Sequence, residues 1–197
     1  MDSLAVFCGS SSGSHPSHVR MARELGEQLG WHGITLVYGG GRVGLMGHLA
    51  DGALSAGGKV VGVIPKSLFE KEIGHTGLSE LIVTNTMHER KFIMADRASA
   101  FIGLPGGFGT LDELFEILTW AQLGIHTKPV GLLNINGFFD KLLNWLSQVV
   151  LSEGFIKQQH LQNLIVVSDS VQQLLQRLSA AVPENSNISN SSQTDFR

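Results

Sequence analysis

Short apolar runs alternate along the chain with longer segments in which apolar residues recur every three or four positions. Short, nearly continuous apolar runs are typical of strands buried on both faces of a parallel sheet, whereas the longer period is typical of amphipathic helices. The pattern predicts strands over Leu4–Cys8, Thr35–Tyr38, Lys59–Ile64, Leu81–Thr84, Ala100–Leu104, Pro129–Leu133 and Leu164–Val167.

The helical segments fall between these runs, so strands and helices alternate. Repeated βα units favour parallel strands joined by right-handed crossovers, and they predict an α/β fold: a Rossmann-like, doubly wound, mainly parallel sheet with helices on both faces. We expect a single domain over residues 1–182 and a disordered polar tail over residues 183–197. Helices are predicted over Val19–Leu29, Leu45–Ala56, Met87–Ser99, Thr110–Leu123, Phe138–Leu151 and Val171–Ala181.

Composition narrows the function classes. The formal net charge is −3, so no basic excess marks a surface for nucleic acid or an anionic membrane. The single cysteine, Cys8, excludes a disulfide framework and a multi-cysteine metal site, and the eight histidines are scattered without a metal-binding pattern. No export segment and no apolar run long enough to span a bilayer is visible, so we expect a cytoplasmic protein.

Glycine is unusually frequent, with 24 glycines in 197 residues, and many of them lie in three loops that follow predicted strands. These loops cover residues 8–13, 38–44 and 104–110. Ligands of open α/β sheets bind beyond the carboxyl ends of the strands, and glycines there let backbone N–H groups converge on an anion at a helix start. The loops are either tight turns alone or, together, a site for a phosphate-bearing ligand, which is the interpretation we favour.

Two standard nucleotide motifs fit poorly. Gly39, Gly41 and Gly44 match the dinucleotide fingerprint in spacing, but no acidic residue follows about 20 residues later to hold a ribose. The spacing of Gly52 and Gly57 resembles a P-loop, but the required Lys-Ser/Thr does not follow. An NAD site and an ordinary ATPase or kinase are therefore disfavoured.

Two charged residues are candidates for chemistry. Arg90 lies near the start of a predicted helix, where a cation opposes the helix dipole, so it is either a solvated surface residue or a ligand for an anion. Met87 shares its helix face and belongs either to an apolar pocket or to the core. Glu113 lies in the first turn of the helix whose start would hold phosphate. A carboxylate there suits the dipole, and it also suits ribose hydroxyls or developing positive charge on a sugar.

Several motifs together resemble one family. Residues 105–113 fit the pattern PGGxGTxxE. The segments 38–47, 87–91 and 119–124 also match motifs of this family, and all of these motifs occur in the order and at the spacing that the family shows. The chain thereby resembles the LOG (Lonely Guy) family of cytokinin riboside 5′-monophosphate phosphoribohydrolases, often mislabelled lysine decarboxylases. The similarity runs from about Leu4 to Ala181.

The resemblance implies a Rossmann-like homodimer that hydrolyses the N-glycosidic bond of a nucleoside 5′-monophosphate, giving free base and ribose 5-phosphate. It implies that Arg90 and Glu113 are catalytic, and that no metal or cofactor is needed. The expected substrate and phosphate contacts are Gly40, Gly41, Met87, Lys91, Gly106, Gly107, Gly109 and Thr110, together with Glu72 and Thr119.

Alternatives stay open at this point. The same scaffold could carry a nucleotide or phosphorylated cofactor without catalysis, although such a binder gains little from Glu113. A pyridoxal-dependent decarboxylase would need a Schiff-base lysine, and no lysine here has that context. Within the hydrolase reading, Glu113 could stabilise charge, hold ribose hydroxyls or activate water, and Arg90 could bind phosphate or orient Glu113.

Overall fold

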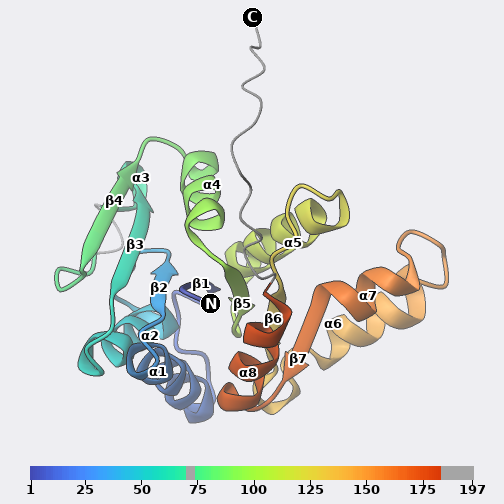
Figure 1. Cartoon of the computed structure of the whole chain (residues 1–197), viewed down its shortest axis with the longest axis horizontal. Helices are drawn as coiled ribbons and strands as arrows, with labels where there is room; N and C mark the ends of the chain where they lie inside the picture. The colour runs from blue at the N-terminus through green and yellow to red at the C-terminus, as the bar shows by residue number, and fades with distance from the viewer. Residues whose placement is uncertain (70–73, 183–197) are drawn as a thin grey trace, which may run out of the picture.

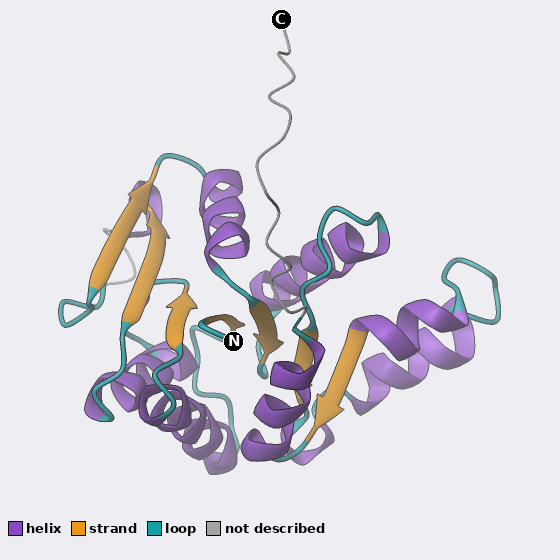
Figure 2. Cartoon of the chain, viewed as in Figure 1, coloured by secondary structure: helices purple, strands orange, loops and turns teal. Residues whose placement is uncertain are grey.

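A computed structural model describes residues 1–69 and 74–182. The strands form one seven-stranded sheet in the order β4-β3-β2-β1-β5-β6-β7, and every pair is parallel (Figures 1 and 2). The expected Rossmann-like α/β fold is thereby confirmed. The strands are β1 Ser3–Phe7, β2 Thr35–Tyr38, β3 Val60–Pro65, β4 Glu80–Thr84, β5 Ala100–Gly103, β6 Val130–Leu133 and β7 Ile165–Ser168.

Helices follow the strands in sequence and cover both faces of the sheet. Helices α1, α2 and α8 enclose one apolar core, and α4 and α5 enclose a second core on the opposite face. Figure 1 shows these two layers below and above the sheet. The helices are α1 Pro16–Trp31, α2 Gly44–Ser55, α3 Lys66–Phe69, α4 Met87–Arg97, α5 Phe108–Gln122, α6 Asp140–Trp145, α7 Gln158–Leu164 and α8 Val171–Ala181.

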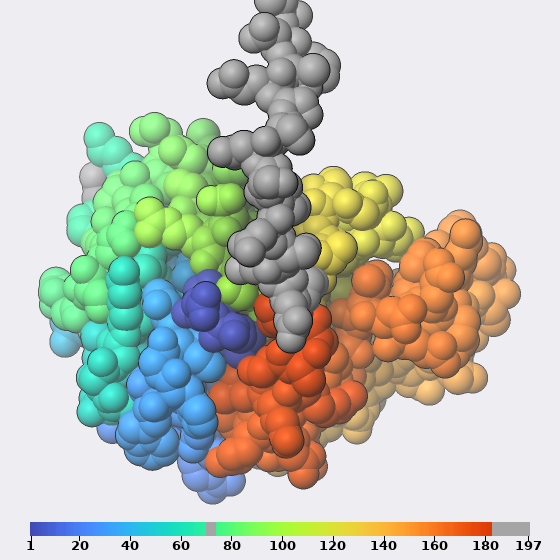
Figure 3. Space-filling model, in the orientation of Figure 1, coloured from blue at the N-terminus to red at the C-terminus, as the bar shows by residue number. Residues whose placement is uncertain are grey.

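The segment after β6 differs from the prediction of one helix over Phe138–Leu151. Asn136 and Gly137 adopt positive φ angles of 52° and 69°, which end a short 3-10 turn and delay the helix to Asp140. A π-helical segment, Leu146–Val150, then continues α6. The prediction also missed α3 and α7, in which no residue is buried, so neither carries an apolar period. Figure 3 shows the orange α6–α7 segment standing out from the body of the molecule.

The order of the strands locates the ligand crevice. The chain builds outward from β1 through β2 to β4, then returns to the other side of β1 for β5 to β7. A ligand site is expected at this reversal, beyond the carboxyl ends of β1 and β5. The loops after these strands meet there, since the Gly9 N–H donates to the Pro105 carbonyl at 3.1 Å.

Some expectations lie outside what the structure describes. Glu72 falls in the gap between residues 69 and 74, and the tail begins at residue 183. Among the described residues, no helix combines the length and apolarity needed to cross a membrane. The same residues contain no group of three or more His, Cys, Asp or Glu side chains arranged to hold a metal ion.

Candidate active site

The amino end of α5 is open. Its N-cap is Gly107, which has no side chain to accept from the first N–H groups of the helix. A Cβ added to Gly107 or Gly109 would meet no atom within 4 Å. Unpaired N–H groups and the helix dipole make such an end attractive to an anion. The neighbouring α4 lacks this property, because its start is closed by its own residues.

In α4 the N-cap Thr86 hydroxyl accepts from the Glu89 N–H at 3.1 Å. The Glu89 carboxylate in turn accepts from the Asn85 N–H at 2.8 Å. The Thr86 side chain thus satisfies one N–H of the first turn of α4, and the Glu89 carboxylate places a negative charge at this helix start. Of the two helices, α5 is therefore the one whose start suits an anion.

Gly106 and Thr110 shape the floor of the open end. A Cβ on Gly106 would overlap the Thr110 hydroxyl and would lie 2.9 Å from the Gly9 nitrogen. Thr110 itself is buried. Only glycine at position 106 therefore lets the loops after β1 and β5 meet above the first turn of α5.

Arg90 of α4 and Glu113 of α5 form an ion pair between the two helices. Arg90 Nη2 lies 3.3 Å from Glu113 Oε1, and the two side chains are only 11% and 9% exposed. Arg90 is also held by the sheet, because its Nε donates a hydrogen bond to the Val63 carbonyl of β3 at 3.0 Å. The structure thus brings together the two residues that were expected to be catalytic.

Two more residues fix the guanidinium. A Cβ on Gly39 would overlap Arg90 Nη2, so the bare backbone of that glycine makes room for the arginine. Arg90 Nη1 donates to the Met87 sulfur at 3.3 Å. Met87 is partly exposed and belongs to the site, whereas Met94, on the same helix face, is in the core.

The environment of Glu113 perturbs its acidity. Burial raises the pKa of Glu113, and the positive charge of Arg90 opposes that shift. Cys8, at the end of β1, is buried close to this pair. Burial first, and then the charge of Glu113, raise the pKa of the Cys8 thiol far above its usual range. A thiol held neutral in this way is a poor nucleophile.

Lys91 lies beside Arg90 but is engaged elsewhere. Its Nζ lies 3.1 Å from Asp112 Oδ2 and 3.1 Å from Glu116 Oε1, both on α5. Burial acts to lower the pKa of Lys91, but the hydrogen bonds to these two carboxylates outweigh it and raise the pKa. A contact between Lys91 and a ligand stays a prediction.

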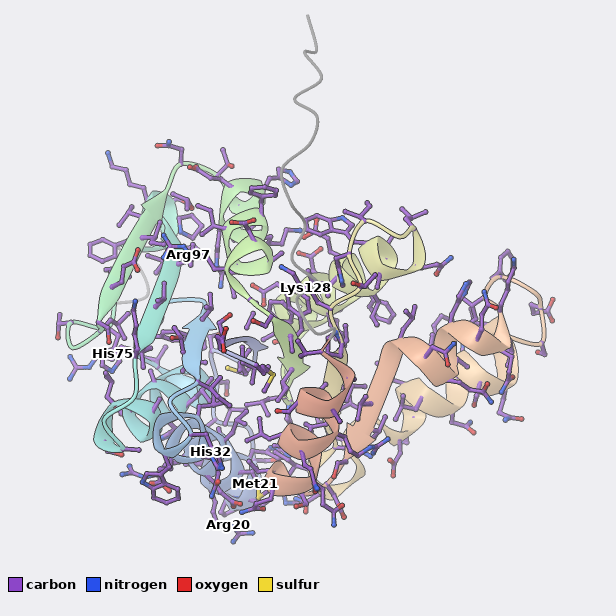
Figure 4. The ribbon with its side chains drawn as sticks, viewed as in Figure 1. Arg20, Met21, His32, His75, Arg97 and Lys128 are labelled. Carbon is purple, nitrogen blue, oxygen red and sulfur yellow. The ribbon has the colours of Figure 1, made fainter. Side chains whose placement is uncertain are left out.

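The expected contacts Gly40 and Gly41 are buried in the protein. Gly40 has a φ of +77°, a Cβ there would lie 3.1 Å from the Ile64 Cβ, and its carbonyl accepts from the His75 N–H at 3.2 Å. Gly41 forms an isolated antiparallel bridge with Gly74. His75, labelled in Figure 4, is fixed in turn by Asp51, 3.0 Å from its Nε2. These glycines join the end of β2 to the segment before β4, and a ligand contact for them stays a prediction.

Thr119 lies two turns further along α5 than Glu113. Its hydroxyl donates to the Phe115 carbonyl at 2.7 Å. It lines a small, mainly apolar groove with residues of α7, including Leu161 and Leu164. The groove that it lines does not include Arg90 or Glu113, and a ligand contact for Thr119 stays a prediction.

Sequence reasoning missed four contributors to the site. Gly39 was considered only as part of a glycine-rich loop and of a disfavoured dinucleotide fingerprint. The contact of the Val63 carbonyl is made by the backbone, so the residue type gives no signal for it. Asp112 and Glu116 carry a signal that was available, because acidic residues four apart lie on one helix face. Nothing in the sequence, however, shows that this face meets Lys91.

Comparison with known proteins identifies the family. A family model described as "Possible lysine decarboxylase" matches residues 46–178. LOG2 of Arabidopsis thaliana, a cytokinin riboside 5′-monophosphate phosphoribohydrolase, is 48% identical over 182 residues, covering 92% of this chain and 84% of the relative. LOG of Oryza sativa subsp. japonica, also a cytokinin riboside 5′-monophosphate phosphoribohydrolase, is 48% identical over 181 residues, covering 92% of this chain and 74% of the relative. The chain belongs to the LOG family. The resemblance inferred from the motifs is confirmed.

Solved structures share the fold of this LOG family chain. A structural-genomics target solved by X-ray crystallography has a TM-score of 0.68 at 29% identity, covering 91% of this chain and 99% of the other. The molybdenum cofactor binding protein of Rippkaea orientalis has a TM-score of 0.69 at 23% identity, covering 92% and 98%. The second likeness is one of fold alone.

Proposed function

We propose that the protein is an N-glycosyl hydrolase that cleaves a nucleoside 5′-monophosphate, of the adenine or cytokinin type, into free base and ribose 5-phosphate. The observation that carries this proposal is the buried Arg90–Glu113 ion pair beside the open start of α5. The names of the relatives LOG2 and LOG, which are 48% identical to this chain, support the same reaction.

The phosphate of the substrate would bind at the start of α5. Gly107 and Gly109 leave the backbone accessible there, and Gly106 and Thr110 form the floor. The binding energy of the phosphate then serves to align C1′ of the ribose for reaction. A nucleoside without the phosphate loses this alignment and should be a poor substrate.

Glu113 would face the sugar. Breaking the C1′–N bond develops positive charge on the ribose, and a carboxylate nearby stabilises it. Water adds its oxygen to C1′ as the base leaves with the bonding electron pair and takes up a proton from solvent. A carboxylate with a raised pKa is well suited to accept the proton that the attacking water gives up. Burial provides this raised pKa in Glu113.

Arg90 would hold the carboxylate in place. Its guanidinium reaches Glu113 while its Nε and Nη1 are fixed by the Val63 carbonyl and the Met87 sulfur. A group anchored at three points restricts the rotamers of its partner, which keeps Glu113 ready for the transition state. Met87, partly exposed beside it, is proposed as a substrate contact.

The proposal includes a homodimer acting in the cytoplasm. Large apolar side chains are exposed on several elements, among them Phe108 at the start of α5, which is 94% exposed. Exposed apolar side chains of this size favour a protein partner where they form a patch. Light scattering after size exclusion should give twice the chain mass, and cell fractionation should recover the protein with the cytoplasm. The exposed large apolar side chains include, besides Phe108, those of Phe92, Leu123, Ile125, Trp145, Val149 and Phe155.

The test is product analysis by liquid chromatography. Purified protein is incubated with AMP, isopentenyladenosine 5′-monophosphate and the matching nucleosides. Base should appear from the monophosphates only, and Glu113→Gln should slow its release roughly 100-fold or more. Glu153→Gln, the same change at an exposed residue after α6, is the matched control and should keep the activity. Tight binding of AMP without release of base would contradict the proposal.

A further inference from the structure

Two neighbouring residues of α4 reach across to the same stretch of α5. Arg90 pairs with Glu113, and Lys91 pairs with both Asp112 and Glu116. Lys91 is only 10% exposed, so its ammonium group is removed from most of the solvent that would compete for its hydrogen bonds. Two of its three donors are taken by carboxylates on α5.

We propose that Asp112 and Glu116 are positioning residues that hold Lys91 as a clamp between α4 and α5 and thereby set the distance between Arg90 and Glu113. This inference rests on the proposed function of the same site. It gives Lys91 a task other than the substrate contact expected from the sequence.

The charges around Lys91 argue against a phosphate contact. Arg90 and Lys91 contribute two positive charges, and Asp112, Glu113 and Glu116 contribute three negative ones, so the cluster has a formal charge of 2 − 3 = −1. A cluster of this sign repels a phosphate and attracts a sugar that develops positive charge. The phosphate is instead served by the start of α5, where the N–H groups are open.

The rest of α4 already has its own anchors. At its carboxyl end, Lys128 Nζ donates to the Ala95 carbonyl at 2.7 Å, and Arg97 pairs with Glu80 of β4 at 2.9 Å. Figure 4 labels both cations. These contacts fix α4 to the sheet, but they do not fix it to α5.

The backbones of α4 and α5 make few direct contacts. The two helices share the second apolar core, and the ion pairs of Arg90 and Lys91 join them directly on its polar side. Since Lys91 has two partners and is adjacent to Arg90, it is placed to resist both sliding and separation of the helices.

The clamp has opposing electrostatic effects on Glu113. The charged groups that act on Glu113 are Arg90 and Lys91 from α4 and Asp112 and Glu116 from α5, and the neutral thiol of Cys8, directly after β1, lies close by. Of these, Lys91 lowers the pKa of Glu113, whereas Asp112 and Glu116 raise it. Removing Lys91 should thus raise the pKa of Glu113, and removing Asp112 and Glu116 should lower it. Both changes should loosen the same connection between α4 and α5.

This contrast defines the experiment. Lys91→Met and the double variant Asp112→Asn, Glu116→Gln are compared with wild type in steady-state kinetics on AMP. Both should lower kcat roughly tenfold with KM changed less than about twofold, and the triple variant should be no slower than either. The acid limb of the pH profile should move up in Lys91→Met and down in the double variant.

A second measurement is independent of turnover. Calorimetric titration with ribose 5-phosphate should give similar affinities for wild type, Lys91→Met and the double variant. The carboxyl resonance of Glu113, followed by carbon-13 NMR, should titrate higher in the first variant and lower in the second. Glu80→Gln, which removes an exposed pair at the far end of α4, is the control and should change none of these readouts.

The contrary results are distinct. If Lys91 contacts phosphate, Lys91→Met weakens ribose 5-phosphate binding and raises KM. The double variant, which frees the lysine, then changes neither the affinity nor KM. This pair of results overturns the clamp. Multiplicative losses of kcat in the triple variant also overturn it. If wild type releases no base at all, the proposed function fails, and the clamp is decided by the titration of Glu113: unchanged values in both variants overturn it.

Discussion

Two glycine-rich loops flank the site, one after β2 and one after β5, and they use their glycines differently. In the loop after β2, Gly39 lies against Arg90 and Gly40 against β3. Gly44, with a φ of +63°, lies against the backbone of Ser10. In the loop after β5, Gly107 and Gly109 face open space. One loop packs the protein against itself, and the other leaves its backbone free for a ligand.

The difference explains why the dinucleotide fingerprint in the loop after β2 was misleading. Its glycine spacing is right, but the close approaches it permits are to Arg90, Ile64 and Ser10 rather than to a cofactor. A glycine pattern reports that something lies close to the backbone. It does not report whether the neighbour is a ligand or the protein.

The largest expected effect comes from filling the space beside Arg90, which Gly39 leaves open. In Gly39→Ala the new methyl group overlaps Arg90 Nη2, so the guanidinium must move away from Glu113. We expect kcat on AMP to fall roughly 100-fold, because misplacement by about 1 Å has that cost. Affinity for ribose 5-phosphate should persist in calorimetry, since the start of α5 is unchanged. Lost affinity together with retained kcat would assign Gly39 to the ligand.

Gly44→Ala tests the packing role by stability. Its φ of +63° strains any other residue, and the added Cβ overlaps the Ser10 backbone. We expect the free energy of unfolding to drop by about 2 kcal/mol or more, from strain and overpacking together. Urea denaturation followed by circular dichroism measures the change. An unaltered midpoint would mean that the loop after β2 is not packed as described.

Gly109→Ala is the matched substitution in the open loop. It lies in the first turn of α5 and its methyl group meets nothing within 4 Å, so stability should hold or rise by about 0.5 kcal/mol. If phosphate approaches the backbone here, the methyl group obstructs it, and KM for AMP should rise roughly tenfold, about 1.4 kcal/mol. An unchanged KM in steady-state kinetics would leave the open loop without a ligand.

The smallest expected effect is on pH dependence. Burial raises the pKa of Glu113, so its ionised form is lost at a higher pH than in an exposed glutamate, near 4.3. The proposed role of Glu113 requires the carboxylate form, so kcat/KM should fall as the pH drops through this raised pKa. A pH profile with the acid limb at or below about pH 4.3 would contradict this role for Glu113.

The fold could be predicted from the sequence because strands of a parallel sheet that are buried on both faces consist of short, nearly continuous apolar runs. The strand Thr35–Tyr38 and the helix Val171–Ala181 have the predicted bounds, and the other strands differ by a residue or so at their ends. The helix expected over Phe138–Leu151 begins two residues later, at Asp140, and its second part, Leu146–Val150, is π-helical, which an apolar period does not distinguish from an α-helix. Helix α7, lacking any buried residue, had no period to find.

For the site, residue types were predictable but their pairings were not. Arg90 and Glu113 were recognised from a motif resemblance and from helix position. The ion pair between them joins residues 23 positions apart, on helices that cross above the sheet, and such contacts depend on packing rather than on spacing. The engagement of Lys91 by Asp112 and Glu116 was invisible for the same reason.

The most direct test of the central claim is phosphorus-31 NMR of wild-type protein with AMP, observed in real time. Cleavage at C1′ moves the phosphorus signal from AMP to ribose 5-phosphate, and adenine accumulates in equal amount. The arrangement of Arg90 and Glu113 beside the open start of α5 predicts this result. A signal of inorganic phosphate with adenosine as the co-product would mean that the P–O bond breaks instead, and would contradict the account.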